Sequence, residues 1–528
     1  MGGWGRVDSG WRGARKELLM CRGSIAFVVI MKVFLFLLGI GAVLPLVTLN
    51  QTAVAQAANA QGDDVALDWL LDEGLFAMTP DDLETKAGSR FFVWQDKERT
   101  RARFNPDDFD FQLKGNDVGE VLIKFKEGKV AAVTVSVMNK GDEMAVITRG
   151  TFNEAVKTVK GVLGEASGVK EEPRRKEELL SAQSEGAVWR CKKALYIGEW
   201  LFLPEKREEI DGWIWTTKEH GEFVRVRIMP PQVQLGVQLN RIRTTVSRPL
   251  LAAKVKREGK AKAVIEGLPM VDQGSKGYCA VASLERVLRH YGADVDMHDL
   301  ANAAETYGGT NPEKMKTAIQ RMSQRLGLRV REITFMKQKQ YEVLFKNYNI
   351  AARQAGKDVV DLGQLKSSGY IDWMKVDPET LRKFRTKGSD FTAFKQALVD
   401  NVNKGVPILW ALQLGIYWED KIDESYEANR YAVNKGKSAA DGEKDEVVND
   451  IRKKMEEERK KEMEELRSKG KRPPEYMLGG HMRVIVGYDG ANSRIYYTDS
   501  WGPGHEMKSM SLEEAWACTL ALWALEPS

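Results

Sequence analysis

The length of the chain is the feature that most constrains its fold, because 528 residues are more than one hydrophobic core accommodates. A prior of about 150 residues per domain predicts two to four domains. The hydrophobic fraction is 43% and the charged fraction is 29%, as in ordinary globular proteins. These values exclude a collagen, a wholly disordered chain and a polytopic membrane protein. We therefore expect at least two folded domains.

The formal net charge of +5 comes mostly from the first 60 residues, which hold six basic and two acidic side chains. The rest of the chain is therefore nearly neutral. A nucleic-acid-binding protein normally carries a basic stripe on its folded domain. We expect no nucleic-acid partner.

A targeting signal is predicted in residues 1–60. Val33–Val47 is an uncharged, mostly apolar run that basic residues precede and small residues follow, with Ala-x-Ala frames that end at Ala55, Ala57 and Ala60. This order is typical of a cleaved secretory signal peptide. We expect an exported protein, located in the periplasm, at the cell surface or in the medium.

An uncleaved anchor is the alternative, since Ile25–Val47 approaches membrane-spanning length, although Lys32 interrupts it. In that case the protein would be attached to the membrane through this segment alone. Met31 would also make a compact start, which leaves the natural start codon open.

Residues 62–230 predict an α+β accessory domain. Its clearest hairpin joins strands Val121–Phe125 and Lys129–Met138, and a helix is expected from Thr151 to Leu163 with Gly164 as its stop. Nothing in this stretch indicates a chemical role.

A second domain, residues 268–528, follows a basic stretch at 231–267 that we interpret as a linker. Helices are predicted at Cys279–Tyr291 and Asp390–Lys404, and the latter leads into an apolar strand at Val406–Leu414. The predicted fold class of the whole chain is α+β.

An insertion of 59 residues, 419–477, interrupts this second domain and is mostly charged. Its portion Asp445–Ser468 combines strong helix formers with alternating charges, which is typical of a solvated helix. A lid that covers the substrate is the alternative, because long insertions beside active sites are often functional.

Signal cleavage would remove one of four cysteines and leave Cys191, Cys279 and Cys518. An odd number leaves at least one free thiol, and whether Cys191 and Cys518 form a disulfide stays open. The sequence has no Cys-x-x-Cys pair and no histidine cluster, so we expect neither a metal nor another cofactor.

Cys279 is the candidate nucleophile, because it opens a predicted helix directly behind a glycine-containing loop. The N-terminus of a helix stabilises a thiolate through its partial positive charge. Gln273 lies in the loop six residues earlier, where its amide could donate to an oxyanion together with the backbone N–H of Cys279. Alternatively, Cys279 is only a small buried residue.

His481 begins a predicted strand that runs to Tyr488, and a second strand ends at Asp499 after a turn. A hairpin would bring the start of the first strand beside the end of the second, so Asp499 could bond His481 and complete a Cys-His-Asp relay. His290 lies about 16 Å from Cys279 along the same helix and cannot serve as its base. His505 lacks a strand to orient it.

These residues resemble the papain-like cysteine peptidases, in which a glutamine, a cysteine at a helix start, a strand-initial histidine and an Asn-Ser-Trp-Gly element form the active site. Here the matching residues are Gln273, Cys279, His481 and the segment 499–502. Asp499 replaces the asparagine, which is closer to the bacteriocin-processing, double-glycine-leader peptidases. The resemblance implies that Trp501 shields the His481–Asp499 hydrogen bond, and we expect Trp501 and Gly480 to line the substrate site.

The sequence thus predicts an exported cysteine peptidase that hydrolyses peptides or proteins. A cell-wall amide hydrolase or transpeptidase with the same relay is one alternative. A non-catalytic papain-like binding module is another, although the presence of all four residue types counts against it. The substrate sequence, the role of residues 62–230 and the oligomeric state stay open.

Overall fold

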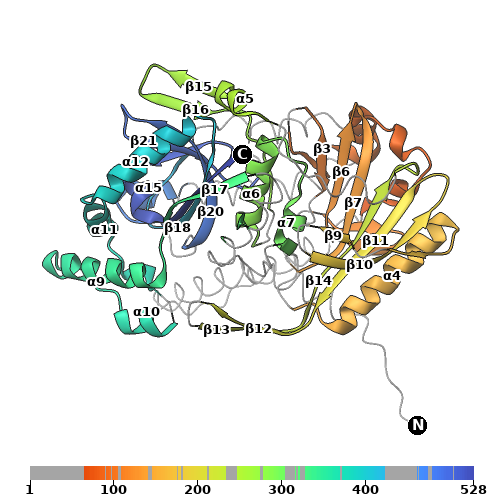
Figure 1. Ribbon diagram of the computed structural model, residues 1–528, viewed down its shortest axis with the longest axis horizontal. Helices are drawn as coiled ribbons and strands as arrows, with labels where there is room; N and C mark the ends of the chain where they lie inside the picture. Colours follow the sequence, from red (N-terminus) through yellow and green to blue (C-terminus); the bar gives the residue numbers. More distant parts are fainter. Residues whose placement is uncertain are drawn as a thin grey trace, which may run out of the picture. The chain divides into compact units, whose positions relative to one another are not determined.

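The computed structural model describes residues 65–527 in part (Figure 1). The predicted signal region 1–60 lies outside the described residues, as do positions 90, 97, 105–108, 141–145, 175–176, 180–181, 211–212, 234–245, 274–276, 304–315, 317–318, 321–327, 369–370, 422–460, 462, 474–477, 503–504 and 528.

The front part of the chain forms an antiparallel sheet of nine strands. The order is β2 (Val93–Trp94), β3 (Arg101–Phe104), β6 (Val121–Lys126), β7 (Lys129–Asn139), β14 (His220–Met229), β11 (Leu195–Leu203), β10 (Ala182–Arg190) and β8 (Glu172–Pro173), with β9 (Glu177–Leu179) also on β10.

The predicted hairpin is confirmed as β6 and β7, which pair in antiparallel register. Its two turn residues, Glu127 and Gly128, have φ of 54° and 73°. Positive φ at both positions is the requirement of a two-residue turn that matches the twist of the strands.

Helix α4 (Arg149–Ser167) packs against β11 and β14 and buries Phe152, Val159 and Leu163. The prediction that Gly164 ends this helix is wrong. The helix continues for another turn and ends at Gly168, which has φ of 66° and can adopt this left-handed conformation without strain. A glycine inside a helix weakens it without necessarily terminating it.

Smaller elements complete the front part. They are the three-stranded sheet β1 (Val65–Ala66), β4 (Phe111–Leu113) and β5 (Asn116–Val118), the hairpin β12 (Lys206–Ile210) and β13 (Trp213–Thr217), and short helical turns at Asp68–Leu71, Leu75–Ala77, Pro80–Leu83 and Glu84–Gly88.

A second antiparallel sheet of nine strands forms the rest of the structure. Its order is β17 (Leu328–Phe335), β23 (Thr519–Pro527), β18 (Ile408–Leu414), β20 (Gly479–Asp489), β21 (Arg494–Thr498), β22 (Lys508–Ser511) and β19 (Asp420–Lys421), with β16 (Lys262–Ile265) on β20 and β15 (Val255–Glu258) on β16.

This sheet begins inside the stretch that we interpreted as a linker. Helix α5 (Arg248–Ala253) and the β15–β16 hairpin precede residue 268, and β16 pairs with β20. The hairpin escaped detection because Val255, Ala263 and Ile265 are its only fully buried apolar residues among exposed charges.

Alternate residues of the second sheet face two separate cores. Leu409 and Val484 pack with α6 (Cys279–His290) and α7 (Met297–Ala303), whereas Trp410 and Ile485 pack on the opposite face. Helices contributing to that opposite core are α9 (Gln338–Gln354), α10 (Leu362–Ser368), α11 (Pro378–Arg385), α12 (Ser389–Val402) and α15 (Leu512–Cys518), beside a helical turn at Trp373–Lys375 (Figure 1).

Residues 64–528 form one compact unit, so a separate front domain is not confirmed. Most of the insertion 419–477 lies outside the described residues; within the predicted helix 445–468, positions 463–468 are helical. In the described part of the chain, every helix is too short or too polar to cross a membrane.

Candidate active site

Cys279 is the first residue of α6, and its thiol is free and partly exposed. The helix packs against β20, where the Ser283 hydroxyl donates to the Met482 carbonyl over 3.1 Å. This bond fixes the first turn of α6 beside the strand that carries His481.

His481 and Asp499 meet through the register of β20 and β21, in which Val484 pairs with Thr498. The His481 Nε2 and Asp499 Oδ1 atoms are 2.6 Å apart, and both side chains are buried. The hairpin brings His481 and Asp499 together although they are 18 residues apart in the sequence, as the strand pattern predicted.

The surroundings of His481 favour its charged form. Burial lowers the pKa of this imidazole, but the Asp499 carboxylate and the hydrogen bond and charge of Cys279 raise it to about 9. At neutral pH the ring is therefore an imidazolium placed between a thiol and a carboxylate.

Trp501 covers the imidazole. The two rings stack with centroids 4.5 Å apart and planes inclined by 24°. Trp501 remains 38% exposed, so one side of it faces solvent while the other shelters His481. A covered hydrogen bond between charged groups is stronger than one in water.

Gln273 is held to the end of β21 by two hydrogen bonds with Ser500. Its backbone N–H donates to the Ser500 carbonyl over 2.8 Å, and the Ser500 hydroxyl donates to Gln273 Oε1 over 2.6 Å. Because Oε1 accepts this bond, the amide nitrogen is the end of the side chain that can serve as a donor elsewhere.

Two cations that the sequence analysis missed contact Asp499. Arg483 Nε donates to Asp499 Oδ2 over 2.8 Å, and Lys508 Nζ lies 3.3 Å from the same oxygen. Asp499 Oδ1 accepts from His481 and, over 2.9 Å, from the backbone N–H of Ser500. Both carboxylate oxygens are thus surrounded by donors.

Glu419 balances the two cations. It accepts from both terminal nitrogens of Arg483, over 2.6 and 3.1 Å, and its Oε2 lies 3.4 Å from Lys508 Nζ. Burial raises the pKa of Asp499, yet His481, Arg483 and Lys508 outweigh it and hold this pKa well below its usual range.

A sequence signal for this cluster existed. Arg483 is the only charged residue between Met482 and Tyr488 in an otherwise apolar strand, and a buried arginine requires an acidic partner. Its partner Glu419 could not be identified, because 64 residues separate the two positions.

Arg286 connects α6 to the same hairpin. Its guanidinium donates to the Asp499 carbonyl and to the Thr498 hydroxyl, and its Nε donates to the Pro269 carbonyl over 2.8 Å. Helix α6 and the residues at the end of β21 are therefore joined by one buried side chain.

The comparison with known protein families points to the same stretch of chain. Residues 265–520 match the family model described as Peptidase C39 like family. This match supports a papain-like cysteine peptidase, and Gln273, Cys279, His481 and Asp499 all lie inside it. No curated protein matches the chain.

The Peptidase C39-like match begins at Ile265, the last residue of β16, shortly before the predicted domain start at 268. The front sheet lies outside the match.

The remaining histidines lie away from the relay position. His290 contacts the Gly405 carbonyl at the far end of α6, and burial, aided by Lys254, lowers its pKa to about 4. His505 lies edge-on to Trp501, with centroids 5.5 Å apart. It is close to the cleft, but His481 is the ring that contacts Asp499.

Gly480 is exposed at the start of β20, directly before His481. A Cβ atom placed there would meet no atom within 4 Å. Cys191 and Cys518 are free thiols, which answers the question of a disulfide between them. Among the described residues, no group of three or more His, Cys, Asp or Glu is arranged to hold a metal.

Proposed function

We propose that this protein is an exported cysteine peptidase in which Cys279 is the nucleophile, His481 the acid and base, and Asp499 the group that orients His481. The observation that carries this proposal is the juxtaposition at the start of α6. A free, partly exposed thiol lies beside an imidazole that is itself bonded to a buried carboxylate.

The reaction begins with a thiolate and an imidazolium. The Cys279 sulfur attacks the carbonyl carbon of a peptide bond, and the oxygen becomes an oxyanion that the Cys279 N–H and the Gln273 amide stabilise. His481 gives its proton to the leaving amine as the C–N bond breaks. The acyl group stays on Cys279 as a thioester.

Deacylation uses the same residues in reverse roles. Neutral His481 takes a proton from water, the resulting hydroxide attacks the thioester carbonyl, and the C–S bond breaks. The carboxylic acid leaves, and Cys279 and His481 regain their charges. No cofactor is needed for either half of the reaction.

Asp499 supports a closer relation to the bacteriocin-processing branch than to peptidases with asparagine at this place. The four hydrogen-bond donors around Asp499 also explain why a carboxylate is favoured at this position. The side chain of an asparagine would direct its own NH₂ donor at other donors.

The test is to react the purified protein with a peptidyl electrophile and to map the labelled cysteine by mass spectrometry. We expect label on Cys279, with none in Cys279→Ser and little in His481→Ala. Cys191→Ser is the matched control and should label like the wild type, since Cys191 is also partly exposed and free. Label on Cys191 instead would contradict the assignment.

The chemistry is tested on a mixture of defined peptides, analysed for new termini. A peptidase produces paired fragments from linear peptides. Fragments only from cell-wall peptides, or ligated products, would instead indicate an amide hydrolase or transpeptidase.

Export is tested on protein recovered outside the cytoplasm. Its N-terminus should lie between Val54 and Gln61, because the Ala-x-Ala frames end in this stretch. An N-terminus at Met31 or earlier would rule out signal cleavage.

A further inference from the structure

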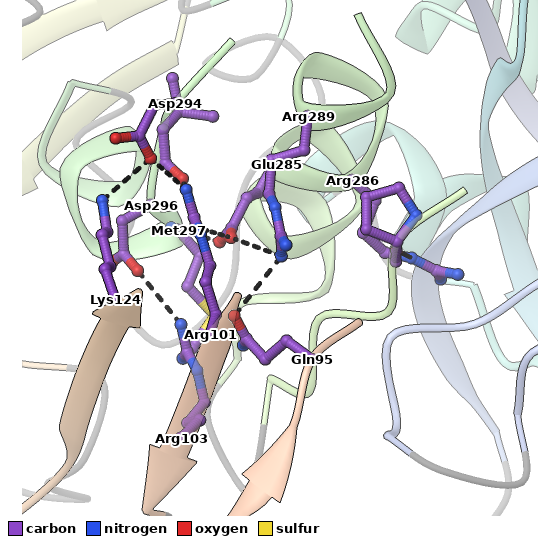
Figure 2. A network of polar contacts seen from close by, with 12 residues as sticks. Gln95, Arg101, Arg103, Lys124, Glu285, Arg286, Arg289, Asp294, Asp296 and Met297 are labelled. Carbon is purple, nitrogen blue, oxygen red and sulfur yellow. Dashed lines mark hydrogen bonds and ion pairs between the residues drawn. The ribbon is translucent and has the colours of Figure 1, made fainter. Parts of the chain in front are cut away.

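A buried polar network joins the front sheet to the nucleophile helix (Figure 2). Arg101 on β3 is its centre. Its Nη1 contacts Glu285 Oε1 on α6 over 3.2 Å and the Val295 carbonyl over 3.0 Å, and its Nη2 contacts Asp294. The Arg101 side chain is 8% exposed and that of Glu285 is fully buried.

A second arginine of β3 extends the network to the residues before α7. Arg103 lies 2.6 Å from Glu120 of the front part and donates to Asp296 over 3.1 Å. Lys124 on β6 adds a bond of 3.0 Å to Asp294. In these contacts the front sheet supplies the cations. Most of the carboxylates come from residues 285–296, on α6 and directly after it.

The helix also contributes a cation of its own. Arg289 of α6 contacts Asp96 of the front part over 3.0 Å and Gln95 Oε1 over 3.4 Å. Figure 2 shows Arg289 and Arg101 on either side of Glu285. Substituting a single partner from the front part, such as Arg101 or Asp96, would leave a buried charge on α6 less compensated, which is destabilising.

Asn139, the last residue of β7, contacts the residue that is next to Cys279 in the chain. Its Nδ2 donates to the Tyr278 hydroxyl over 3.0 Å, and both side chains are buried. Tyr278 directly precedes Cys279, and its carbonyl accepts the first hydrogen bond of the helix, from Ala282, over 2.8 Å. The peptide unit that follows Tyr278 carries the Cys279 N–H.

Helical spacing shows which side of α6 the front sheet holds. Tyr278, Glu285 and Arg289 are seven and four residues apart and share one face, which contacts the front sheet. Cys279 and Ser283 are four apart and share a different face, which is turned to β20. The front sheet therefore supports α6 from behind and leaves the thiol accessible.

We propose that residues 65–229 are a permanent support of the active site, in which Asn139 and Arg101 are positioning residues for Cys279. A removable inhibitory segment would cover the thiol, whereas these contacts fix the helix on another face. The inference rests on the proposed role of Cys279 as nucleophile. It assigns a role to the front sheet that no sequence motif suggested.

The experiment measures how fast iodoacetamide alkylates Cys279 in the folded, full-length protein between pH 5 and 9, a readout that needs no peptide substrate. The variants are Asn139→Leu, Tyr278→Phe and the double variant. We expect each single change to slow alkylation at neutral pH about 10-fold, because a displaced helix start weakens the Cys279–His481 pair. The double variant should be no slower than the worse single one.

Asn349→Leu is the matched control. Asn349 is also buried and forms two side-chain hydrogen bonds, of 2.8 Å each, to Val360, but it lies on α9. It should lower the melting temperature while Cys279 keeps its alkylation rate. An equal slowing in Asn349→Leu, or a normal rate in folded Asn139→Leu and Tyr278→Phe, would overturn the proposal.

Arg101 provides a second test should Asn139→Leu fail to fold. Arg101→Lys preserves the charge and should retain most of the alkylation rate, whereas Arg101→Met should slow it. If the Cys279 of wild-type protein reacts no faster than Cys191, the nucleophile assignment fails. If Cys279 is alkylated fast in the wild type and more slowly in these variants, but no peptide is cleaved, the supporting role of the front sheet is confirmed and the proposed substrate class is wrong.

Discussion

Two buried carboxylates, Glu285 on α6 and Asp499 beside it, both lie among arginines, yet their pKa values are shifted in opposite directions. The pKa of Asp499 is held well below its usual range by His481, Arg483 and Lys508. Burial and the neighbouring Asp296 raise the pKa of Glu285, and its arginines only partly offset this.

The distances explain the difference. Asp499 has cationic donors at 2.6, 2.8 and 3.3 Å, whereas the two arginines that contact Glu285 do so at 3.2 and 3.6 Å. The candidate site therefore stabilises the charged form of Asp499. The charge of Glu285 is only partly compensated by its arginines. Substitutions around Asp499 and around Glu285 should therefore have unequal effects.

The largest effect is expected from the relay itself. Cys279→Ser replaces the thiol with a hydroxyl that does not ionise near neutral pH, so peptide cleavage should fall to background while the protein stays folded. His481→Ala should be nearly as damaging, and the two changes together no worse than the worse one. Initial rates and circular dichroism check this.

Cys191→Ser should remain fully active, as the control for general damage. Retained activity in His481→Ala, abolished by a further His505→Ala, would transfer the role of base to His505.

The second-largest effect is expected from Asp499→Asn. This substitution tests whether activity requires the negative charge of Asp499 or only a side chain of the same shape that orients His481. The amide would direct its NH₂ group at a donor and would leave Arg483 and Lys508 less compensated. We expect activity to fall by about 10³-fold, in the range seen when a buried orienting carboxylate is neutralised. A loss below tenfold would show that orientation alone suffices.

The sequence pointed to the candidate catalytic side chains because each has a local signal. Cys279 opens a helix, His481 lies near the start of a strand, and a short turn pairs that strand with the one that ends directly before Asp499. Gln273 was predicted from its spacing to Cys279. The Gln273–Cys279 and His481–Asp499 pairs each lie within fewer than thirty residues, where secondary structure nearly determines proximity, whereas Cys279 and His481 were brought together by the resemblance.

The supporting residues could not be predicted, because only the tertiary fold brings them together. Lys508 reaches Asp499 through the pairing of β22 with β21, and Glu419 reaches Arg483 from the start of the insertion. The contact of Asn139 with Tyr278 spans 139 residues, and that of Arg101 with Glu285 spans 184. No local pattern in a single sequence specifies such pairs.

The third prediction concerns stability and pH on the Asp499 side. Because the pKa of folded His481 is raised to about 9, its protonation stabilises the fold fully below pH about 6.5, and this contribution is lost as pH rises to about 9. The loss should amount to about 3 kcal/mol at most. Urea unfolding at pH 6.5 and 9.5 should show it in the wild type.

The His481→Gln variant lacks this titration and should lose less stability over the same interval. Equal losses in both proteins would show that other groups determine the pH dependence.

The fourth prediction contrasts Glu285→Gln with Asp499→Asn. The folded pKa of Glu285 is raised, so its contribution to stability falls as pH rises from about 4.5 through that pKa. The cost of Glu285→Gln should therefore be larger at pH 4.5 than at pH 7, where we expect about 1 kcal/mol. Asp499 has a lowered pKa, so its contribution to stability is lost as pH falls below 3.8 and is fully present above it, and the cost of Asp499→Asn should be nearly the same at pH 4.5 and 7. Unfolding curves at pH 4.5 and 7 measure both costs, and a cost of Glu285→Gln that is no larger at pH 4.5 than at pH 7 would contradict the prediction.

The smallest effect is expected from Gly480→Ala. This substitution changes the surface where substrate would lie and leaves the charged residues of the proposed relay unchanged. Gly480 is exposed, and an added Cβ meets no atom within 4 Å, so stability should change by less than about 0.5 kcal/mol. The His481–Asp499 bond lies on the buried side of the strand and should persist, which leaves kcat within about twofold. Because the methyl group would project from the exposed face of the strand, opposite to His481, any effect should be on KM, which steady-state kinetics on a cleaved peptide resolve. A fall in kcat with unchanged KM would mean that Gly480 acts through His481 rather than on the substrate.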